Sequence, residues 1–242
     1  YEEAAVLYRS NAQSRAIEEA LLRVSIPYRI YGGLRFYERL EIKNAISYLR
    51  IIFNNNDNPS FERSISNPTR GVGEKTLAKI RNAAKQYNIS YIKASAKLID
   101  EGKISGRGGS GLKDYLEFIA GCKGFIEENS LSDLMELIIK ETGLYAYHAK
   151  EAGEKGKTRT ENLEELITAT KNFEQSIKDE RTNIEIAESY LDIISLDSGD
   201  RQASEHDDAA QLMTMHSAKG LEFKLVLLTG LEESLFPHGR SM

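Results

Sequence analysis

Cysteine is almost absent from this sequence of 242 residues, in which Cys122 is the only one. A single cysteine forms no internal disulfide, and no group of cysteines and histidines has the spacing of a structural zinc site, so we expect no bound metal. No apolar run approaches the roughly 18 residues of a membrane-spanning helix, and mean hydropathy is -0.44. No charged and then apolar leader opens the chain. These absences predict a cytoplasmic protein without membrane contact.

An excess of basic residues is also missing. The 37 acidic and 32 basic side chains give a formal charge of -5, which argues against a protein that coats nucleic acid with its whole surface. The charge is unevenly spread, however. Residues 63–85 hold six bases and one acid, whereas residues 174–208 hold eleven acids and three bases. One part of the chain is therefore suited to face a polyanion.

Both ends of the chain have the pattern of α/β protein. Ala4–Tyr8 is a short apolar run typical of a strand buried on both faces, and a helical pattern follows it until Pro27. A second strand is predicted at Tyr28–Tyr31, which completes a βαβ unit of a parallel sheet. Two more apolar strands are predicted near the other end, at Gln211–Met215 and Leu225–Thr229. We expect the first strand and these last two to be neighbours in one sheet.

The middle of the chain is predicted to be helical. Five stretches have apolar residues at helical spacing, and they begin near Ile42, Leu77, Leu134, Leu163 and Ala187. Polar breaks are predicted at 54–59 and 106–111, and an acidic connector at 196–208. The expected fold is a discontinuous α/β sheet domain of residues 1–37 and 202–242, interrupted by a large all-α domain of residues 38–201.

Two glycine motifs do not predict a nucleotide-binding site. Residues 106–111 (GRGGSG) match G-x-G-x-x-G, but no strand precedes them, so we interpret them as a flexible loop. Residues 73–76 (GEKT) lack the adjacent Gly-Lys and the upstream strand of a P-loop. The sequence holds no Walker A segment, and the chain alone is not expected to bind a nucleoside triphosphate in the usual way.

The segment 211–223 (QLMTMHSAKGLEF) is far more specific. A strand is predicted to end at Thr214, and hydroxyl, imidazole, ammonium, glycine and carboxylate groups follow within nine residues. On a parallel sheet such groups collect at the carboxyl ends of the strands, where ligands bind. The plain structural alternative is that His216 ends a strand and Lys219 lies in a solvated turn.

Residues 214–223 (TMHSAKGLEF) resemble motif V of the UvrD/PcrA/Rep helicases of superfamily 1. Five further segments resemble stretches of that family in the same order, namely 5–15 (AVLYRSNAQSR), 32–43 (GGLRFYERLEIK), 67–73 (NPTRGVG), 159–166 (RTENLEEL) and 230–238 (GLEESLFPH). The departures are mild: Val72 replaces isoleucine, Arg35 stands where lysine is frequent, and Met215 stands where leucine is usual. The resemblance covers essentially the whole chain.

The resemblance implies a fragment of an ATP-dependent 3′–5′ DNA helicase of repair or replication, from a bacterial nucleoid. The fragment would be the incomplete second RecA-like domain, 2A, with the inserted helical domain 2B. The P-loop, Walker B and tyrosine-arginine motifs would precede it, and the final arginine motif would follow it. ATP and Mg²⁺ are then cofactors of the full-length protein, neither bound tightly by the fragment, which alone is expected to be inactive. Expected partners are single-stranded and duplex DNA, the missing N-terminal RecA-like domain, and repair or replication proteins on the helical domain. The alternative is a non-catalytic DNA- or protein-binding module.

Site residues follow from the resemblance position by position. Glu222 and Gly220 fall where the family binds the nucleotide, with the carboxylate accepting from a ribose hydroxyl. Six residues fall where the family touches single-stranded DNA or its phosphates, and they are Arg9, Asn11, Arg35, Thr214, His216 and His238. Such amide, hydroxyl, imidazole and guanidinium groups hold phosphates without reading bases.

Structural alternatives stand beside some of these roles. Asn11 or Ser10 is a favourable helix N-cap, Arg35 has the spacing to pair with Glu38, and His238 follows a proline in a turn.

The segment RGVG at 70–73 predicts a duplex contact. Two glycines before a helix let backbone N–H groups face outward and bind a phosphate without regard to base identity. The predicted contact residues lie in the basic region, and they are Thr69, Arg70, Gly71, Val72, Gly73, Lys75 and Thr76. The alternative is a glycine-rich turn between two helices.

Overall fold

The structure is a computed structural model of the chain that describes residues 1–199 and 208–231, and of residues 196–199 only the backbone. The chain divides into two compact units, one formed by Tyr1–Arg39 with the residues from Ile194 onward, the other by Leu40–Ile193. The sequence places the corresponding domain limits at residues 37 and 201, the latter outside the described residues. Among the described helices, none has the length and apolar character needed to cross a membrane.

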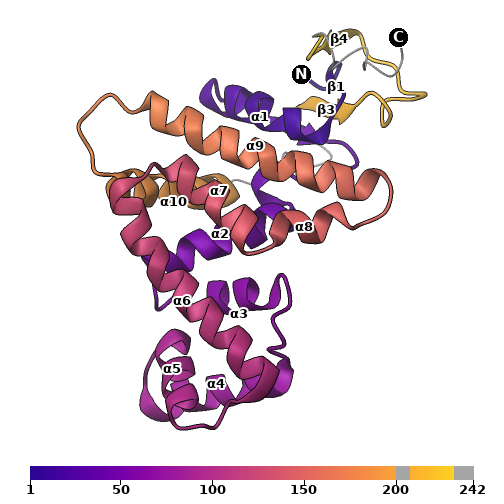
Figure 1. Cartoon of the computed structure of the whole chain (residues 1–242). Coiled ribbons are helices and arrows are strands. Elements are labelled where there is room, and N and C mark those ends of the chain that lie inside the picture. Colours follow the sequence, from indigo (N-terminus) through magenta and orange to yellow (C-terminus); the bar gives the residue numbers. More distant parts are fainter. Residues whose placement is uncertain (200–207, 232–242) are drawn as a thin grey trace. The chain divides into compact units, whose positions relative to one another are not determined.

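Four parallel strands form the sheet of the first unit, which we call the sheet unit (Figure 1). They are β1 (Ala4–Tyr8), β2 (Tyr28–Ile30), β3 (Ala210–Thr214) and β4 (Leu225–Leu228), in the order β2-β3-β1-β4. The chain therefore leaves the sheet after β2 and returns to its centre with β3. The prediction that the first strand and the last two are neighbours in one parallel sheet is confirmed.

Between β1 and β2 the chain forms a short 3₁₀ turn, η1 (Asn11–Gln13), and the helix α1 (Ser14–Arg23). Ser10 and Gln13 make the capping box that their spacing predicts: the Ser10 hydroxyl accepts from Ala12 N, and Gln13 Oε1 accepts from Ser10 N at 2.9 Å. A second 3₁₀ turn, η2 (Phe36–Glu38), follows β2. The capping box fixes where the chain turns at the end of β1.

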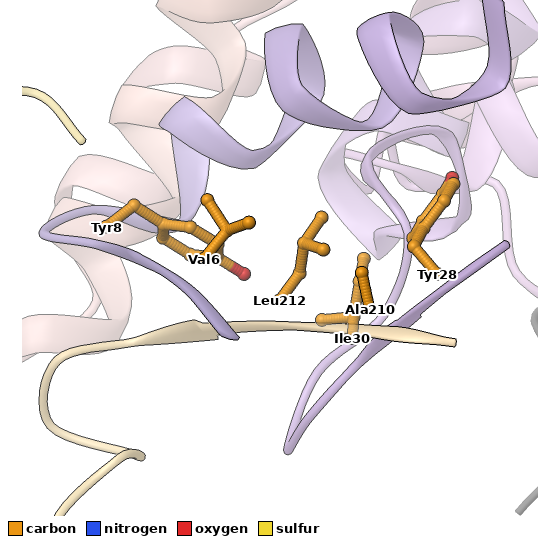
Figure 2. Packing of buried hydrophobic residues seen from close by; sticks show 6 residues of the cluster. All are labelled: Val6, Tyr8, Tyr28, Ile30, Ala210 and Leu212. Atoms are coloured by element: carbon orange, nitrogen blue, oxygen red, sulfur yellow. The ribbon is translucent and has the colours of Figure 1, made fainter. Parts of the chain in front are cut away.

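A hydrophobic cluster of the sheet unit lies on one face of the sheet, against α1. Alternate residues of three strands point to this face (Figure 2), and they are Val6, Tyr8, Tyr28, Ile30, Ala210 and Leu212. Ile17, Leu21 and Leu22 of α1 pack against them. The apolar residues that recur at every second position in the strands and at every third or fourth position in α1 therefore pack together in one layer.

The strand β4 forms where the sequence predicts an apolar strand, but its side chains are not buried. All four of its side chains are exposed, from 42% for Leu228 to 52% for Leu225. Among the described residues its one neighbour in the sheet is β1. An apolar sequence favours burial, but no described part of the chain covers the side chains of β4.

In the second unit, which we call the helical unit, the regular elements of the described residues are all helices, joined by turns and loops. They are α2 (Leu40–Phe53), α3 (Asn58–Ser66), α4 (Glu74–Tyr87), α5 (Tyr91–Asp100), α6 (Gly106–Glu128), α7 (Leu131–Glu141), α8 (Leu144–Ala149), α9 (Glu154–Ser176) and α10 (Asn183–Gly199, which runs past the unit boundary). The five predicted helices correspond to α2, α4, α7, α9 and α10. Because α10 continues to Gly199, the connector predicted from Leu196 is helical at its start.

The glycine-rich segment 106–111 is the first part of α6, so its prediction as a flexible loop is wrong. These glycines let α6 approach the backbone before α4. A Cβ on Gly111 would lie 2.1 Å from Arg70 O, and a Cβ on Gly108 would lie 2.9 Å from Gly71 O. Glycine is a weak helix former, but here its missing side chain makes room for a neighbouring chain segment. The glycine-containing segments 106–111 and 70–73 therefore pack against each other.

A buried polar cluster joins α2, α8 and α9, and it includes residues of two segments that resemble the helicase family. Asn162 donates to Glu41 Oε1 at 2.6 Å, and Arg159 lies between the carboxylates of Glu41 and Glu151, at 3.6 and 2.6 Å. His148 Nδ1 lies 2.6 Å from Glu151 Oε1. The hydrogen bond with His148, supported by Arg159, lowers the pKa of Glu151. These residues hold the helices of the unit together.

Candidate nucleic-acid interface

The carboxyl ends of β1 and β3 bring two distant segments of the chain together. Tyr8 of β1 pairs in register with Thr214 of β3, and Met215 N donates to Tyr8 O at 3.0 Å. The residues that follow the two strands therefore start side by side at one edge of the sheet. This is the edge at which parallel α/β sheets bind ligands.

Arg9 and His216 meet at this edge. Arg9 Nη1 lies 3.2 Å from His216 Nδ1, and His216 is exposed. A guanidinium only donates, so His216 Nδ1 is the acceptor in this contact. The pair joins two of the residues predicted to touch single-stranded DNA, and it offers donors to the solvent side of the edge.

The turn after β3 is fixed by Thr214. Its Oγ1 accepts from Ser217 N at 3.2 Å and lies 2.9 Å from Ser217 Oγ, and its carbonyl accepts from Ala218 N at 3.1 Å. The Thr214 hydroxyl thus shapes the loop that carries His216. Further along, Gly220 has a positive φ of 84°, with open space where a Cβ would be. Glu222 is exposed, and it pairs with no group in the described part of the chain.

Asn11 begins η1, and the N-cap of that turn is Ser10. Of the two residues considered for capping, Ser10 is therefore the one used, and the Asn11 side chain is not needed for it. The Asn11 carbonyl accepts from Arg39 Nη1 at 2.8 Å. This bond ties the start of η1 to the residue that follows η2.

Arg35 lies differently from the sequence prediction of a DNA-facing side chain. It is only 3% exposed, its Nε donates to Tyr28 Oη at 3.0 Å, and its guanidinium lies over the Tyr28 ring. Burial keeps this cation from meeting a phosphate at the surface in this conformation. His238 lies outside the described residues.

A buried network behind the sheet edge was missed from the sequence. Arg39 Nη2 donates to Ser14 Oγ at 2.6 Å, and Ser14 Oγ donates to Glu18 Oε1 at 2.7 Å. Glu18 also accepts from Tyr28 Oη and from Phe36 N, each at 3.3 Å. One signal was present: Glu18 follows Ile17 on the apolar side of α1, where an unpaired carboxylate would be unfavourable.

Burial beside this network raises the pKa of Tyr8 to about 12, with Arg39 opposing the effect and Glu18 adding to it. Tyr8 therefore stays protonated at neutral pH and acts here as a core residue rather than an acid or base.

The predicted duplex contact lies at the start of α4. Gly73 is its N-cap, and no side chain in the described part of the chain caps the helix. Gly71 has a φ of 75°, Val72 is buried, and Thr69, Gly73 and Lys75 are exposed. Thr76 is half-buried, and its N–H bonds back to Gly73 O at 2.9 Å. An uncapped helix N-terminus next to a lysine suits an anion.

Arg70 does not face outward with these groups. Its Nη1 donates to Ser64 O at 3.2 Å and to Pro68 O at 2.8 Å, and its Nη2 donates to Thr142 O at 3.1 Å. The guanidinium also lies over the rings of Tyr48 and Tyr115. Its donors therefore hold the loop in shape instead of reaching for a phosphate.

Other bases of the region 63–85 are also engaged. Arg81 pairs with Glu62 and Glu74, and Lys79 Nζ donates to Lys103 O at 3.0 Å. Arg63 Nη1 donates to Asn44 Oδ1 at 3.2 Å. The net charge of this stretch thus overstates what it offers to DNA, and Lys75 is the exposed cation nearest the α4 N-terminus in sequence. Within the described ranges no three acidic, histidine or cysteine side chains gather as metal ligands.

A parallel sheet with polar side chains gathered at the carboxyl ends of its strands places the first unit in the α/β class, whose members commonly bind ligands at that edge. Residues 1–104 and 116–242 match the UvrD-like helicase C-terminal domain, and the chain belongs to this family. The resemblance seen in the sequence is confirmed.

The curated relatives agree. DNA helicase II of Escherichia coli (strain K12) is 46% identical over 240 residues, which cover 99% of this chain and 33% of the relative. DNA helicase II of Salmonella typhimurium is 46% identical over 238 residues. The ATP-dependent DNA helicase PcrA of Bacillus subtilis (strain 168) is 38% identical over 240 residues, 98% of this chain and 32% of the relative. The chain thus spans about a third of the length of these relatives.

Proposed function

We propose that the chain forms part of an ATP-dependent 3′–5′ DNA helicase and supplies a single-strand grip, one side of the ATP site and a contact with duplex DNA. The observation that carries this proposal is the meeting of Arg9 and His216 at the carboxyl ends of β1 and β3. The relatives are DNA helicases by name, and the sheet unit with the helical unit between its strands fits a 2A domain with an inserted 2B domain.

The single-strand grip consists of groups that bind phosphates without reading bases. Arg9 and His216 act directly, with Asn11 next to them at the start of η1 and with His238 by resemblance. Thr214 acts through the turn that it holds. Arg35 supports the edge from beneath, through Tyr28. Backbone contacts of this kind suit a protein that moves along a strand of any sequence.

The ATP site would need groups from outside this chain, because the sequence has no Walker A segment. Glu222 and Gly220 would form its near side, where an exposed carboxylate is free to accept from a ribose hydroxyl. When bound, ATP with Mg²⁺ supplies the free energy of phosphoryl transfer. Its binding would couple to the grip by favouring one of two arrangements of the DNA contacts. The chain alone is then expected to show no ATPase activity.

The duplex contact would use the backbone N–H groups at the start of α4 together with Lys75. Gly71 and Gly73 keep the approach open, Val72 anchors the loop in the core, and Thr69 and Thr76 flank it. Arg70 contributes by holding the loop rather than by touching DNA. Such a site binds a phosphate irrespective of the base it belongs to.

The single-strand grip is tested by Arg9→Ala in the chain. Loss of a charge-assisted hydrogen bond of about 1.5–3 kcal/mol lowers the affinity for an oligothymidine strand by roughly tenfold or more. Because one phosphate contact is lost, the log–log slope of affinity against salt flattens by about 0.7. Fluorescence anisotropy titrations at several salt concentrations measure both the affinity and its dependence on salt.

Arg23→Ala is the matched control, since Arg23 is exposed at the far end of α1 and pairs with no acid in the described part of the chain. Equal binding by both variants and the unaltered chain would contradict the grip. A chain that binds proteins but no DNA would favour the alternative of a non-catalytic protein-binding module.

The duplex contact is tested by Lys75→Ala, which should weaken binding equally for unrelated duplex sequences and flatten the salt slope by about 0.9. Gly73→Val should weaken binding without a change of charge. No atom lies within 4 Å of a Cβ at Gly73 and its φ is -97°, so the valine fits the fold and stands in front of the N–H groups.

Lys85→Ala serves as the control, because Lys85 lies in the last turn of the same helix. An effect of Lys85→Ala as large as that of Lys75→Ala would point to diffuse charge attraction and against a defined site.

A further inference from the structure

An aromatic ring stands exposed at the same edge of the sheet as the grip. Tyr31 directly follows β2, and it is 48% exposed. Its backbone N–H donates to Leu212 O at 2.8 Å, so the residue continues the pairing of β2 with β3. The backbone that carries the ring is therefore held by the sheet while the ring itself meets solvent.

The loop that begins with Tyr31 lies against the turn that carries His216. A Cβ on Gly32 would lie 3.9 Å from Ser217 Oγ, and Ser217 is the residue whose N–H Thr214 holds. On the other side the loop ends at Arg35, which is buried and bonded to Tyr28. Residues 31–34 are all exposed between these two anchors.

The spacing of the strands gives the approximate distance between Tyr31 and the proposed phosphate-binding residue Arg9. Tyr31 follows β2 and Arg9 follows β1, and β3 lies between the two strands. Neighbouring strands are about 4.8 Å apart, so the two positions are separated by about 10 Å along the edge. That distance is about three times the 3.4 Å by which each strand of a duplex advances per nucleotide, so a strand of a few nucleotides reaches from one position to the other.

We infer that Tyr31 is a stacking platform for a base of the single strand whose phosphates Arg9 and His216 hold. This inference rests on the proposed single-strand grip. A tyrosine ring beside cationic and hydrogen-bonding groups is the combination that binds single strands without sequence preference, because every base has a π-face. A duplex keeps its bases stacked inside, so the platform selects single strands over duplex at this edge.

The experiment compares an oligothymidine strand with an abasic strand of the same length, in the unaltered chain and in Tyr31→Ala. Loss of one stacked base lowers the affinity for oligothymidine by about five- to hundredfold, whereas the affinity for the abasic strand stays the same. Tyr31→Phe keeps the ring and should keep the affinity. Leu34→Ala, which removes an apolar side chain that is 56% exposed in the same loop, is the matched control.

A direct signal is available because the sequence has no tryptophan. Tyr31→Trp introduces a single indole, and its fluorescence should be quenched by oligothymidine but not by the abasic strand.

The outcomes separate the two proposals. If the unaltered chain binds both strands equally and Tyr31→Ala changes neither affinity, the platform is refuted and the phosphate grip stands. If the unaltered chain binds neither strand, the proposed grip fails and the platform with it. Circular dichroism verifies that Tyr31→Ala folds, which its exposed position leads us to expect.

Discussion

Arg39→Met is expected to destabilise the sheet unit by about 3–5 kcal/mol, the cost typical of removing one partner from a buried ionic network. Arg39 is 8% exposed, and its guanidinium donates to Asn11 O, to Ser14 Oγ and to Leu34 O. The methionine fills a similar volume but leaves these acceptors unpaired. It also removes a cation that lies close to the Glu18 carboxylate, with Arg39 Nη2 3.9 Å from Glu18 Oε1.

Hydrogen exchange measures this effect in each unit separately. Amides of β1 and β3 should exchange faster in Arg39→Met, while those of α7 and α9 keep their protection. The same change at Arg23, which is exposed on α1, should alter stability by no more than about 0.5 kcal/mol. Equal exchange of β1 and β3 in the two variants would mean that the network contributes little to the fold.

Gly111→Ala is expected to destabilise the helical unit by about 2–3 kcal/mol, as overpacking of a filled interior does. The added Cβ would lie 2.1 Å from Arg70 O, a backbone atom that cannot rotate away. The helix α6 and the loop before α4 must then separate. Because that loop carries the proposed duplex contact, duplex affinity should fall together with stability.

Gly121→Ala is the matched control in the same helix. Gly121 is exposed, and no atom lies within 4 Å of a Cβ built on it, so alanine should stabilise α6 by about 0.5–1 kcal/mol. Urea unfolding of the two variants should thus shift in opposite directions. A stabilisation by Gly111→Ala would show that α6 does not pack on Arg70 as described.

The strands were predictable because short apolar runs bounded by turns have few other uses. The sequence predicts Ala4–Tyr8 with the bounds it has, and the helix between the first two strands predicts that they run in the same direction, as their parallel pairing with β3 shows. The helix α6 could not be predicted at its start, since glycine disfavours helix locally and the reason for it lies in Arg70, far away in the chain. Helix propensity is a weak guide where tertiary packing decides.

Candidate site residues could be named from the sequence, but the direction in which their cations point could not. The sequence counts Arg35 and Arg70 as positive charge, whereas the fold turns Arg35 onto Tyr28 and Arg70 onto three carbonyls. A guanidinium has five donors and a planar face, so it satisfies buried acceptors and packs on aromatic rings as readily as it meets a phosphate. These uses of an arginine can be distinguished only when its partner is known from the three-dimensional structure.

The exposed strand β4 has a consequence for the behaviour of the chain at high concentration. Its four consecutive apolar residues are 42–52% exposed, and Leu231 just after it is 59% exposed. Among the described residues β4 pairs on one side only, which leaves backbone donors and acceptors in a row. Such an edge without charge or proline is a template on which another extended segment adds as a further strand. Self-association of the chain would therefore begin at β4, and a lysine placed at Val226 would oppose it.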